Sequence, residues 1–269
     1  MRHQPYLEGP PQFNVGLKPI AAVDWLLPDD QADWLTSKNK LIDTLQEDIF
    51  VELAGSRPAQ FEAAQLIGLA CNQTIAKDEA PLLAASRLIS DDLVIMENKH
   101  DVWTTTACCL CSPTFFSAQH AIGKSLKALH DPVPDGDYQL AARIGRVFTN
   151  LTSDTILERH NWTVQWSNAR FTPNGAPLRD QAEHASVSEA ATHLFLRVER
   201  QTIRRLSATG AVLFTIRIRL TPVARLLSDP NQRDAFAHAW QNAPPPIRRY
   251  KKWAVLERHV HALLRAPLA

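Results

Sequence analysis

The stretch SAQHAIGKSLKALHDPVP, residues 117–134, contains two histidines that could carry metal chemistry. Its apolar residues recur at helical intervals, which predicts one amphipathic helix over residues 117–130. Two prolines follow His130 and prevent the helix from continuing. His130 is therefore either a cap that interacts with the carbonyl end of the helix dipole or a metal ligand held next to a rigid turn. His120 starts the same helix and is the rival ligand, although no rigid turn flanks it.

Carboxylates are the second group of residues that could do chemistry. Glu199 lies between Arg197 and Gln201 on the polar side of an alternating stretch. It either forms a structural ion pair or faces a pocket, where a carboxylate can bind a protonated amine and accept its proton. Asp91 and Asp92 raise the same question, and a turn that leads into a strand is the alternative to a catalytic role.

The cysteines are three residues of the segment TACCLCS and one distant residue, Cys71. Cys108 and Cys109 are neighbours in an extended segment, so their side chains point to opposite faces and do not easily bridge each other. The spacing also differs from the C-x-x-C turn of metal and iron–sulfur sites. We expect these cysteines to be small buried side chains of a strand.

Composition narrows the class of protein. The chain has 269 residues, of which 45% are hydrophobic and 21% charged, as in an ordinary folded domain. Its 29 basic and 28 acidic residues leave a formal charge of +1, so no global field would attract nucleic acid or an anionic membrane. No signal-like or membrane-spanning apolar run is present. We expect a cytoplasmic protein that recognises its partners locally.

The pattern of apolar residues predicts an α+β protein. Alternation indicates five strands, two before and three after a helical segment, and short turns between them favour an antiparallel sheet. The chain lacks GxGxxG and GxxxxGK[ST] loops, which disfavours nucleotide binding of those kinds. We divide the single unit into an N-terminal arm with helices (1–88), a core (89–222) and C-terminal helices (223–269).

The individual elements follow from period and from start and stop signals. They are an arm over 1–28, a helix after the N-cap pair Asp29 and Asp30, helices over 59–72 and near 81–89, strands over 92–96 and 102–111, helices over 117–130 and 137–151, strands over 161–166, 194–206 and 210–220, and helices over 230–242 and 250–264.

Two strands, interposed helices and three strands around a pocket is also the order of a PAS domain, a sensor fold that often holds haem or flavin. Haem-binding versions place the ligating histidine on a helix between the strand groups, and His130 occupies such a place.

Four segments strengthen this interpretation: ISDDLVIM, IGKSLKALHDPVP, RHNW and, above all, LRVERQTIRRLSATGAVLFTIRIRLTP. Together they resemble the family of haem-dependent oxidative N-demethylase alpha subunits, over about residues 18–264. The resemblance implies a PAS-like enzyme that holds haem b and oxidises a small, dimethylamine-like secondary amine in a monooxygenase reaction that releases formaldehyde. It also implies a separate flavin and iron–sulfur reductase as electron donor.

Individual residues can be given candidate roles, of which the resemblance supplies that of His130 and the chemistry of the side chains supplies the others. His130 would ligate the iron, and Glu199 and Asp91 are the candidate catalytic carboxylates. Cations are needed for the haem propionates, and a solvated strand face is the alternative for the arginines among them. The candidates for the propionates are Lys124, Arg200, Arg204 and Arg205. Asn161 and Trp162 are further candidates for contact with the cofactor. The alternative for Asn161 is a contact with a neighbouring loop, and the alternative for Trp162 is packing in the core.

Two other functions remain open at this point. One is a non-catalytic PAS-like haem sensor, in which His130 holds haem but no substrate reacts. The other is a haem-free scaffold that meets a partner through the basic face formed by Arg248, Arg249, Lys251, Lys252 and Arg258.

Overall fold

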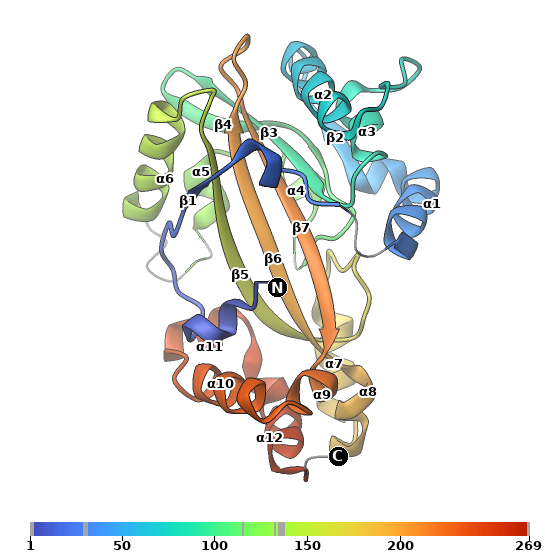
Figure 1. Cartoon of the computed structure of the whole chain (residues 1–269), viewed down its shortest axis with the longest axis vertical. Helices are drawn as coiled ribbons and strands as arrows, with labels where there is room; N and C mark the ends of the chain where they lie inside the picture. The colour runs from blue at the N-terminus through green and yellow to red at the C-terminus, as the bar shows by residue number, and fades with distance from the viewer. Residues whose placement is uncertain (1–2, 29–31, 115, 132, 134–137, 268–269) are drawn as a thin grey trace.

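The computed structural model describes residues 3–28, 32–114, 116–131, 133 and 138–267. Within them seven strands form one antiparallel sheet in the order β1-β5-β6-β7-β3-β4-β2 (Figure 1). The strands are β1 Lys18–Ile20, β2 Phe50–Glu52, β3 Asp92–Lys99, β4 Val102–Cys109, β5 Ile156–Trp166, β6 Leu194–Arg205 and β7 Val212–Pro222. The predicted antiparallel α+β fold is confirmed. The PAS likeness and the division into 1–88, 89–222 and 223–269 stay predictions.

The five predicted strands form the centre of the sheet. β3 and β4 make the expected hairpin, because His100 and Asp101 both have positive φ (51° and 64°), as a tight two-residue turn requires. Gly210 has φ +72° in the turn between β6 and β7, where it was expected. The short edge strands β1 and β2 were not predicted, since three residues show no usable alternation. Cys108 and Cys109 are buried, free side chains of β4, as predicted, while Cys111 is buried and free just beyond the end of this strand.

The N-terminal arm lies across the body of the protein, as expected. It contains the 3-10 helices η1 Pro5–Glu8 and η2 Ala22–Asp24, and its strand β1 pairs with β5. Tyr6 packs edge-on against Trp162 and Phe236, and Trp25 is only 2% exposed. The arm leads into α1 Ala32–Ile49, α2 Arg57–Cys71 and α3 Pro81–Ser86; the predicted N-cap residues Asp29 and Asp30 lie outside the described residues.

The interposed helices differ from the prediction. The single helix expected over 117–130 is wrong: the chain forms α4 Ala118–Ala121 and α5 Leu126–His130, followed by α6 Tyr138–Asn150. The break occurs because Gly123 has φ +74°, outside the helical region, and Ser125 then caps a new helix. Helix α5 nevertheless ends at His130, as expected. Pro132 and Pro134 lie outside the described residues.

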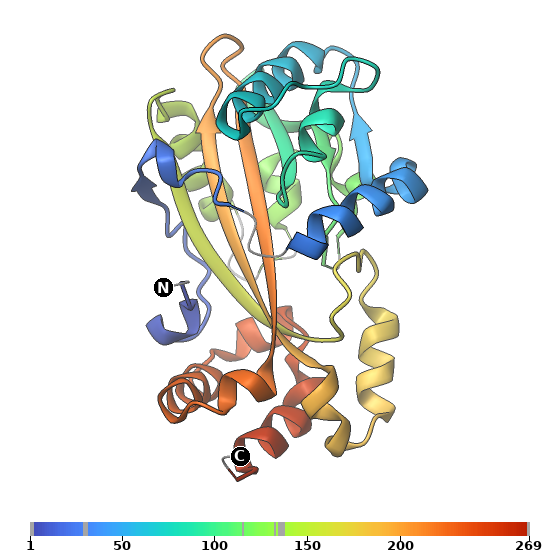
Figure 2. The ribbon, with the colours of Figure 1, turned by 45° about the vertical axis from the view of Figure 1, so that its right-hand side comes forward.

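The C-terminal helices gather at one end of β5, β6 and β7 (Figure 2). They surround a cluster of aromatic side chains, in which Trp240 and Trp253 stack with ring centroids 4.2 Å apart. The single helix expected over 250–264 is wrong, because Lys252 adopts a left-handed conformation (φ 55°) and divides it. The helices here are α7 Ala176–His184, α8 Ala190–His193, α9 Val223–Leu227, α10 Pro230–Gln241, α11 Pro245–Tyr250 and α12 Glu257–Arg265, with η3 Val187–Glu189 and η4 Trp253–Leu256.

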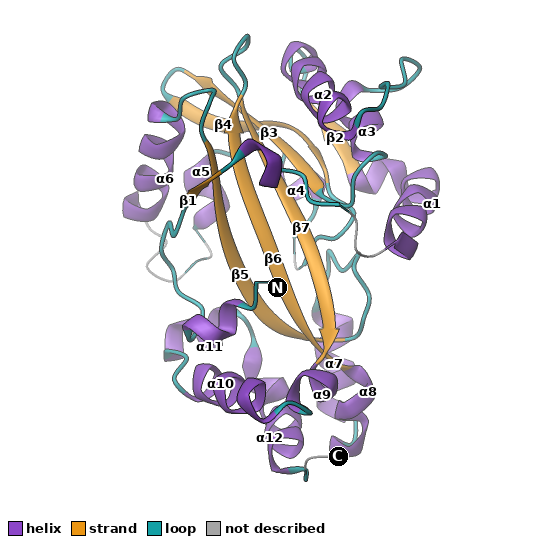
Figure 3. Cartoon of the chain, viewed as in Figure 1, coloured by secondary structure: helices purple, strands orange, loops and turns teal. Residues whose placement is uncertain are grey.

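Helices cover both faces of the sheet, so its strands are buried on two sides. Helix α6 lies left of β5 in Figure 3, and α1 to α3 lie right of β7. Val94, Met96 and Ile203 pack toward α4 to α6, whereas Leu93 and Ile95 pack toward α2 and α3. Alternation along each strand therefore decides which of two different environments a side chain enters. No helix among the described residues is long and apolar enough to cross a membrane, and the expected cytoplasmic location stays a prediction.

Candidate functional site

A cavity of about 320 Å³ lies between the sheet and helices α4 to α6, a size typical of ligand pockets. The arm closes one side of it with residues 11–17, and the end of α11 adds Tyr250 and the following residue, Lys251. Most of its walls are apolar. The apolar lining includes Val94, Met96, Phe116, Leu126, Leu129, Leu140, Ile144, Phe148, Ile203, Phe214 and Ile216.

His130 lines this cavity from the end of α5. The helix is short, and the Ser125 hydroxyl starts it by accepting a hydrogen bond from Ala128 N at 3.2 Å. His130 Nδ1 lies 2.7 Å from the Leu126 carbonyl oxygen, so it carries the proton and leaves the Nε2 lone pair available. Burial lowers the pKa of His130, as does the charge of Arg159, against the opposing effect of the Leu126 hydrogen bond. The imidazole is therefore neutral, as a metal ligand must be.

Glu199 is the only acidic side chain among the described residues that line the cavity. Its carboxylate accepts hydrogen bonds from Arg197 Nε at 3.1 Å, Gln201 Nε2 at 3.2 Å and Asn161 Nδ2 at 3.4 Å. Burial alone would raise the pKa of Glu199, but the charges of Arg197 and Lys251 and these hydrogen bonds lower it. Glu199 thus forms an ion pair with Arg197 and also lines the cavity, while its catalytic role stays a prediction.

Two cations of the cavity were not singled out as site residues from the sequence. Lys251 follows α11, and its Nζ lies 3.2 Å from Asn161 Oδ1. Burial lowers the pKa of Lys251 to about 8, helped by the charges of Arg159 and Arg197 and opposed by Glu199. Arg159 lies two residues before Asn161 on β5, so both side chains project from the same face of the strand.

This alternation could have identified Arg159, because Asn161 was already a candidate. Lys251 had no such signal: it lies far along the chain, after a loop, and was grouped with the basic C-terminal face.

Among the predicted residues, His130, Glu199 and Asn161 come together at the cavity. Lys124 and His120 lie outside it and contact each other, with Lys124 Nζ 2.7 Å from His120 Nε2. Trp162 also lies outside it and packs against Trp253, with ring centroids 5.4 Å apart. The structure thus favours His130 over His120 as the imidazole that faces a cavity.

The remaining predicted residues bind elsewhere. Arg200 pairs with Glu158 and donates a hydrogen bond to the Trp25 carbonyl oxygen at 2.7 Å. The Arg204 guanidinium carbon lies 4.8 Å from the centre of a Trp25 ring. Both side chains project from the sheet face opposite Glu199, because they occupy even positions of β6.

Arg205 donates to the carbonyl oxygens of Phe148 and Thr149 at 3.1 and 3.2 Å, outside the cavity. Asp91 forms a buried ion pair with Arg217, whose Nη2 lies 2.6 Å from Asp91 Oδ2. Asp91 therefore has a structural partner and does not line the cavity.

The cavity fits a haem group on three counts. A single protein imidazole is enough for haem iron, and His130 supplies it with the second nitrogen held by a carbonyl. The walls are mainly apolar, as a porphyrin requires. Arg159 and Lys251 place positive charge at the cavity, where propionates need partners. Within the described residues no group of three or more His, Cys, Asp or Glu could hold a bare metal ion.

A comparison with protein-family models confirms the resemblance seen in the sequence. The matched segment includes His130, Arg159, Glu199 and Lys251 but leaves out the arm. Residues 62–261, well over half of the chain, match the family described as haem-dependent oxidative N-demethylase, alpha subunit-like, and the chain belongs to this family.

Proposed function

We propose that the protein holds haem b through His130 and catalyses the oxidative N-demethylation of a small secondary amine. The family description supports this function. The observation that carries it is the cavity itself, where a neutral imidazole with a free Nε2 and an ionised carboxylate, Glu199, share a mainly apolar enclosure. A carboxylate in such a place suits a cationic amine.

The bound haem would supply the iron that activates dioxygen and oxidises an N-methyl group. Overall, the N-methyl amine and dioxygen, with two electrons and two protons, give the demethylated amine, formaldehyde and water.

The residues of the chain bind and orient the substrate. The Glu199 carboxylate holds the ammonium group of the amine, because a charge-assisted hydrogen bond is strong in an enclosed site. Burial lowers the pKa of Lys251 to about 8, so its Nζ stays mainly protonated near pH 7 and adds positive charge to the same cavity. The apolar walls from α5, α6 and β7 exclude water from the reacting methyl group.

The electrons come from another polypeptide in this proposal. The family description names an alpha subunit, which supports an enzyme of more than one component. We infer that a flavin and iron–sulfur reductase is the electron donor.

The visible spectrum tests the haem ligand first. Purified protein loaded with haem should show a Soret band that His130→Ala abolishes or shifts, while the matched variant His120→Ala leaves it unchanged. An unchanged spectrum for His130→Ala contradicts the proposed ligand.

Turnover then tests the reaction. The haem-loaded protein, supplied with dioxygen, dimethylamine and a chemical reductant, should release formaldehyde. If carbon monoxide or oxygen binds with a spectral change but no tested amine yields formaldehyde, the non-catalytic haem sensor is the better description.

A further inference from the structure

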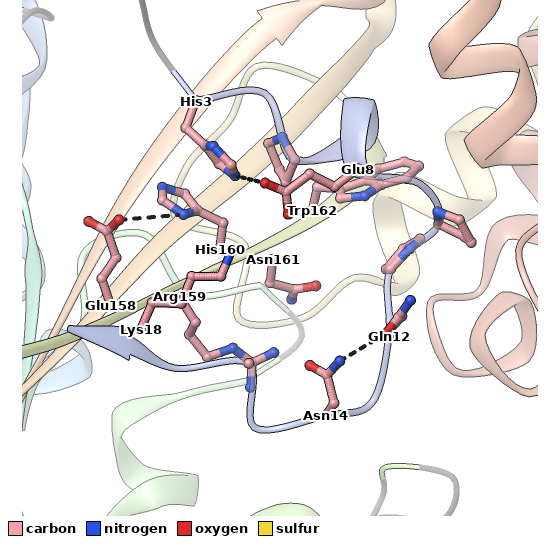
Figure 4. Close-up of a pocket in the computed structure, with 14 residues that line it drawn as sticks. His3, Glu8, Gln12, Asn14, Lys18, Glu158, Arg159, His160, Asn161 and Trp162 are labelled. Atoms are coloured by element: carbon pink, nitrogen blue, oxygen red, sulfur yellow. Dashed lines mark hydrogen bonds and ion pairs between the residues drawn. The ribbon is translucent and has the colours of Figure 1, made fainter. Parts of the chain in front are cut away.

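A second cavity of about 460 Å³ lies between the arm and β5 (Figure 4). One wall is the arm from His3 to Lys18, and the other is β5 from Glu158 to Trp162. This cavity and the one that contains His130 share a set of lining residues, so they adjoin. The shared residues are Pro11, Gln12, Asn14, Arg159 and Asn161.

Arg159 is the charged residue at this junction. In Figure 4 its side chain extends from β5 toward the arm. Its Nε is buried and has no hydrogen-bond partner in the structure. By contrast, Arg197 and Arg217 of the sheet are paired with the carboxylates of Glu199 and Asp91. A guanidinium that is half-buried without a counter-ion is unfavourable unless a ligand supplies the negative charge.

The surroundings of Arg159 do not supply that charge. In the first cavity Lys251 adds a second cation, and the carboxylate of Glu199 is already bound to Arg197. In the second cavity Glu158 is bound to Arg200, and Glu8 lies 3.6 Å from the ring of His3. Charged side chains without an ion-pair partner are therefore mainly cationic where the two cavities meet. Burial lowers the pKa of Arg159, and the charge of Glu199 only partly opposes this effect.

We propose that Arg159, together with Asn161 and Lys251, forms a carboxylate-binding position at the junction of the two cavities. A guanidinium presents a planar fork of donors that matches a carboxylate, and the Asn161 amide and the Lys251 ammonium add donors beside it. The carboxylate belongs either to a haem propionate or to the substrate, which would then be an N-methyl amino acid. This inference rests on the proposed function for the identity of these two ligands.

The first arm of the test compares haem with its dimethyl ester, which lacks free carboxylates. Apoprotein is titrated with each porphyrin and followed by the Soret band. If a propionate binds at Arg159, Arg159→Gln weakens haem binding by about tenfold or more and leaves the affinity for the ester unchanged. Arg159→Lys should retain part of the affinity, and the control Arg204→Gln, on the other sheet face, should match the wild type.

The second arm compares N-methylglycine with dimethylamine, each titrated into haem-loaded protein and followed by the shift of the Soret band. If the substrate supplies the carboxylate, Arg159→Gln weakens binding of N-methylglycine alone and leaves haem affinity intact. If the variant changes neither the haem-to-ester ratio nor the ratio between the two amines, the proposal is overturned.

A structural role for Arg159 predicts something different. Because no carboxylate of the described residues forms an ion pair with Arg159, Arg159→Gln should not lower the thermal unfolding midpoint of the apoprotein. A marked fall in this midpoint, with no ligand discrimination, contradicts a binding role.

These results separate the inference from the proposed function. Protein that binds neither porphyrin refutes the proposed function, and the carboxylate position is then tested on the apoprotein with acetate. Acetate should raise the unfolding midpoint of the wild type but not of Arg159→Gln, and equal midpoints in both overturn the position.

Discussion

Glu199→Gln is the substitution that best tests how the cavity binds an amine. It keeps the size of the side chain and removes its charge. The wild-type carboxylate accepts hydrogen bonds from Arg197, Asn161 and Gln201, and it is the only acidic side chain of the described lining. After the substitution a bound ammonium would face the cations of the cavity with no negative side chain among the described lining residues to offset them.

The magnitude follows from the interactions that are lost. Opposite unit charges about 4 Å apart attract by about 4 kcal/mol at an effective dielectric constant of roughly 20, before desolvation is subtracted. The net contribution of a hydrogen bond to a charged group is about 1.5–3 kcal/mol. This corresponds to amine binding that is about 10- to 150-fold weaker in Glu199→Gln.

The assay is a titration of haem-loaded protein with dimethylamine, followed by the Soret band. Dimethyl ether is the matched uncharged ligand, and its affinity should stay the same. Gln201→Met is the matched variant, because it removes a hydrogen bond to Glu199 but keeps the charge, so its loss of amine affinity should be much smaller. Equal losses for amine and ether, or no loss for the amine, would refute this account of Glu199.

Three further predictions concern the supports of the site. The first is that the Soret band should persist as pH falls through 6.5. The lowered pKa of His130 keeps its imidazole neutral at a pH where a histidine of the unfolded chain becomes protonated. Loss of the band at or above pH 6.5 in a pH titration contradicts this prediction. Ser125→Ala should destabilise the protein by about 1 kcal/mol in urea unfolding and weaken haem binding, since it removes the cap of the helix that carries His130. Arg217→Met should cost about 3–5 kcal/mol by leaving Asp91 buried and unpaired, whereas the double variant Asp91→Leu/Arg217→Met should lose less. The haem spectrum of both variants should match the wild type, and a changed spectrum would mean that Asp91 acts at the haem.

Much of the fold was predictable because its strands alternate strongly and are bounded by turns with plain signals. Gly210 marked one turn, and the polar segment before Val102 marked the other. The helix over 117–130 was misjudged for a physical reason: a glycine with φ +74° interrupts the backbone without disturbing the apolar period on either side. A period of apolar residues shows which side chains share a face, but it does not show that every residue between them is helical.

The site was predictable in part for the same reason. Alternation correctly placed Glu199 and Gln201 on one side of β6, and by the same rule Arg200 and Arg204 belong on the other. Placing the catalytic candidate Glu199 and the cofactor-binding candidates Arg200 and Arg204 in one pocket contradicted that rule. Sequence alone does not tell which face of a sheet lines a cavity, and Lys251 enters the cavity only through tertiary packing of the C-terminal helices.

Both faces of the sheet contribute to this cavity: one face lines it, and the opposite face holds the arm in place. On the face opposite Glu199, Arg200 and Arg217 donate hydrogen bonds to the carbonyl oxygens of Trp25 and Leu27, each at 2.7 Å, and so attach the arm to the sheet. Each of these arginines also forms an ion pair with a carboxylate, which neutralises its charge, so both hold the arm and neither is available to bind a ligand. Another segment of the same arm, residues 11–17, lies along the cavity. This segment is outside the family-matched residues 62–261. It follows that the imidazole and the carboxylate come from the part of the chain that matches the family, while the shape of one wall is set by a segment that lies beyond it.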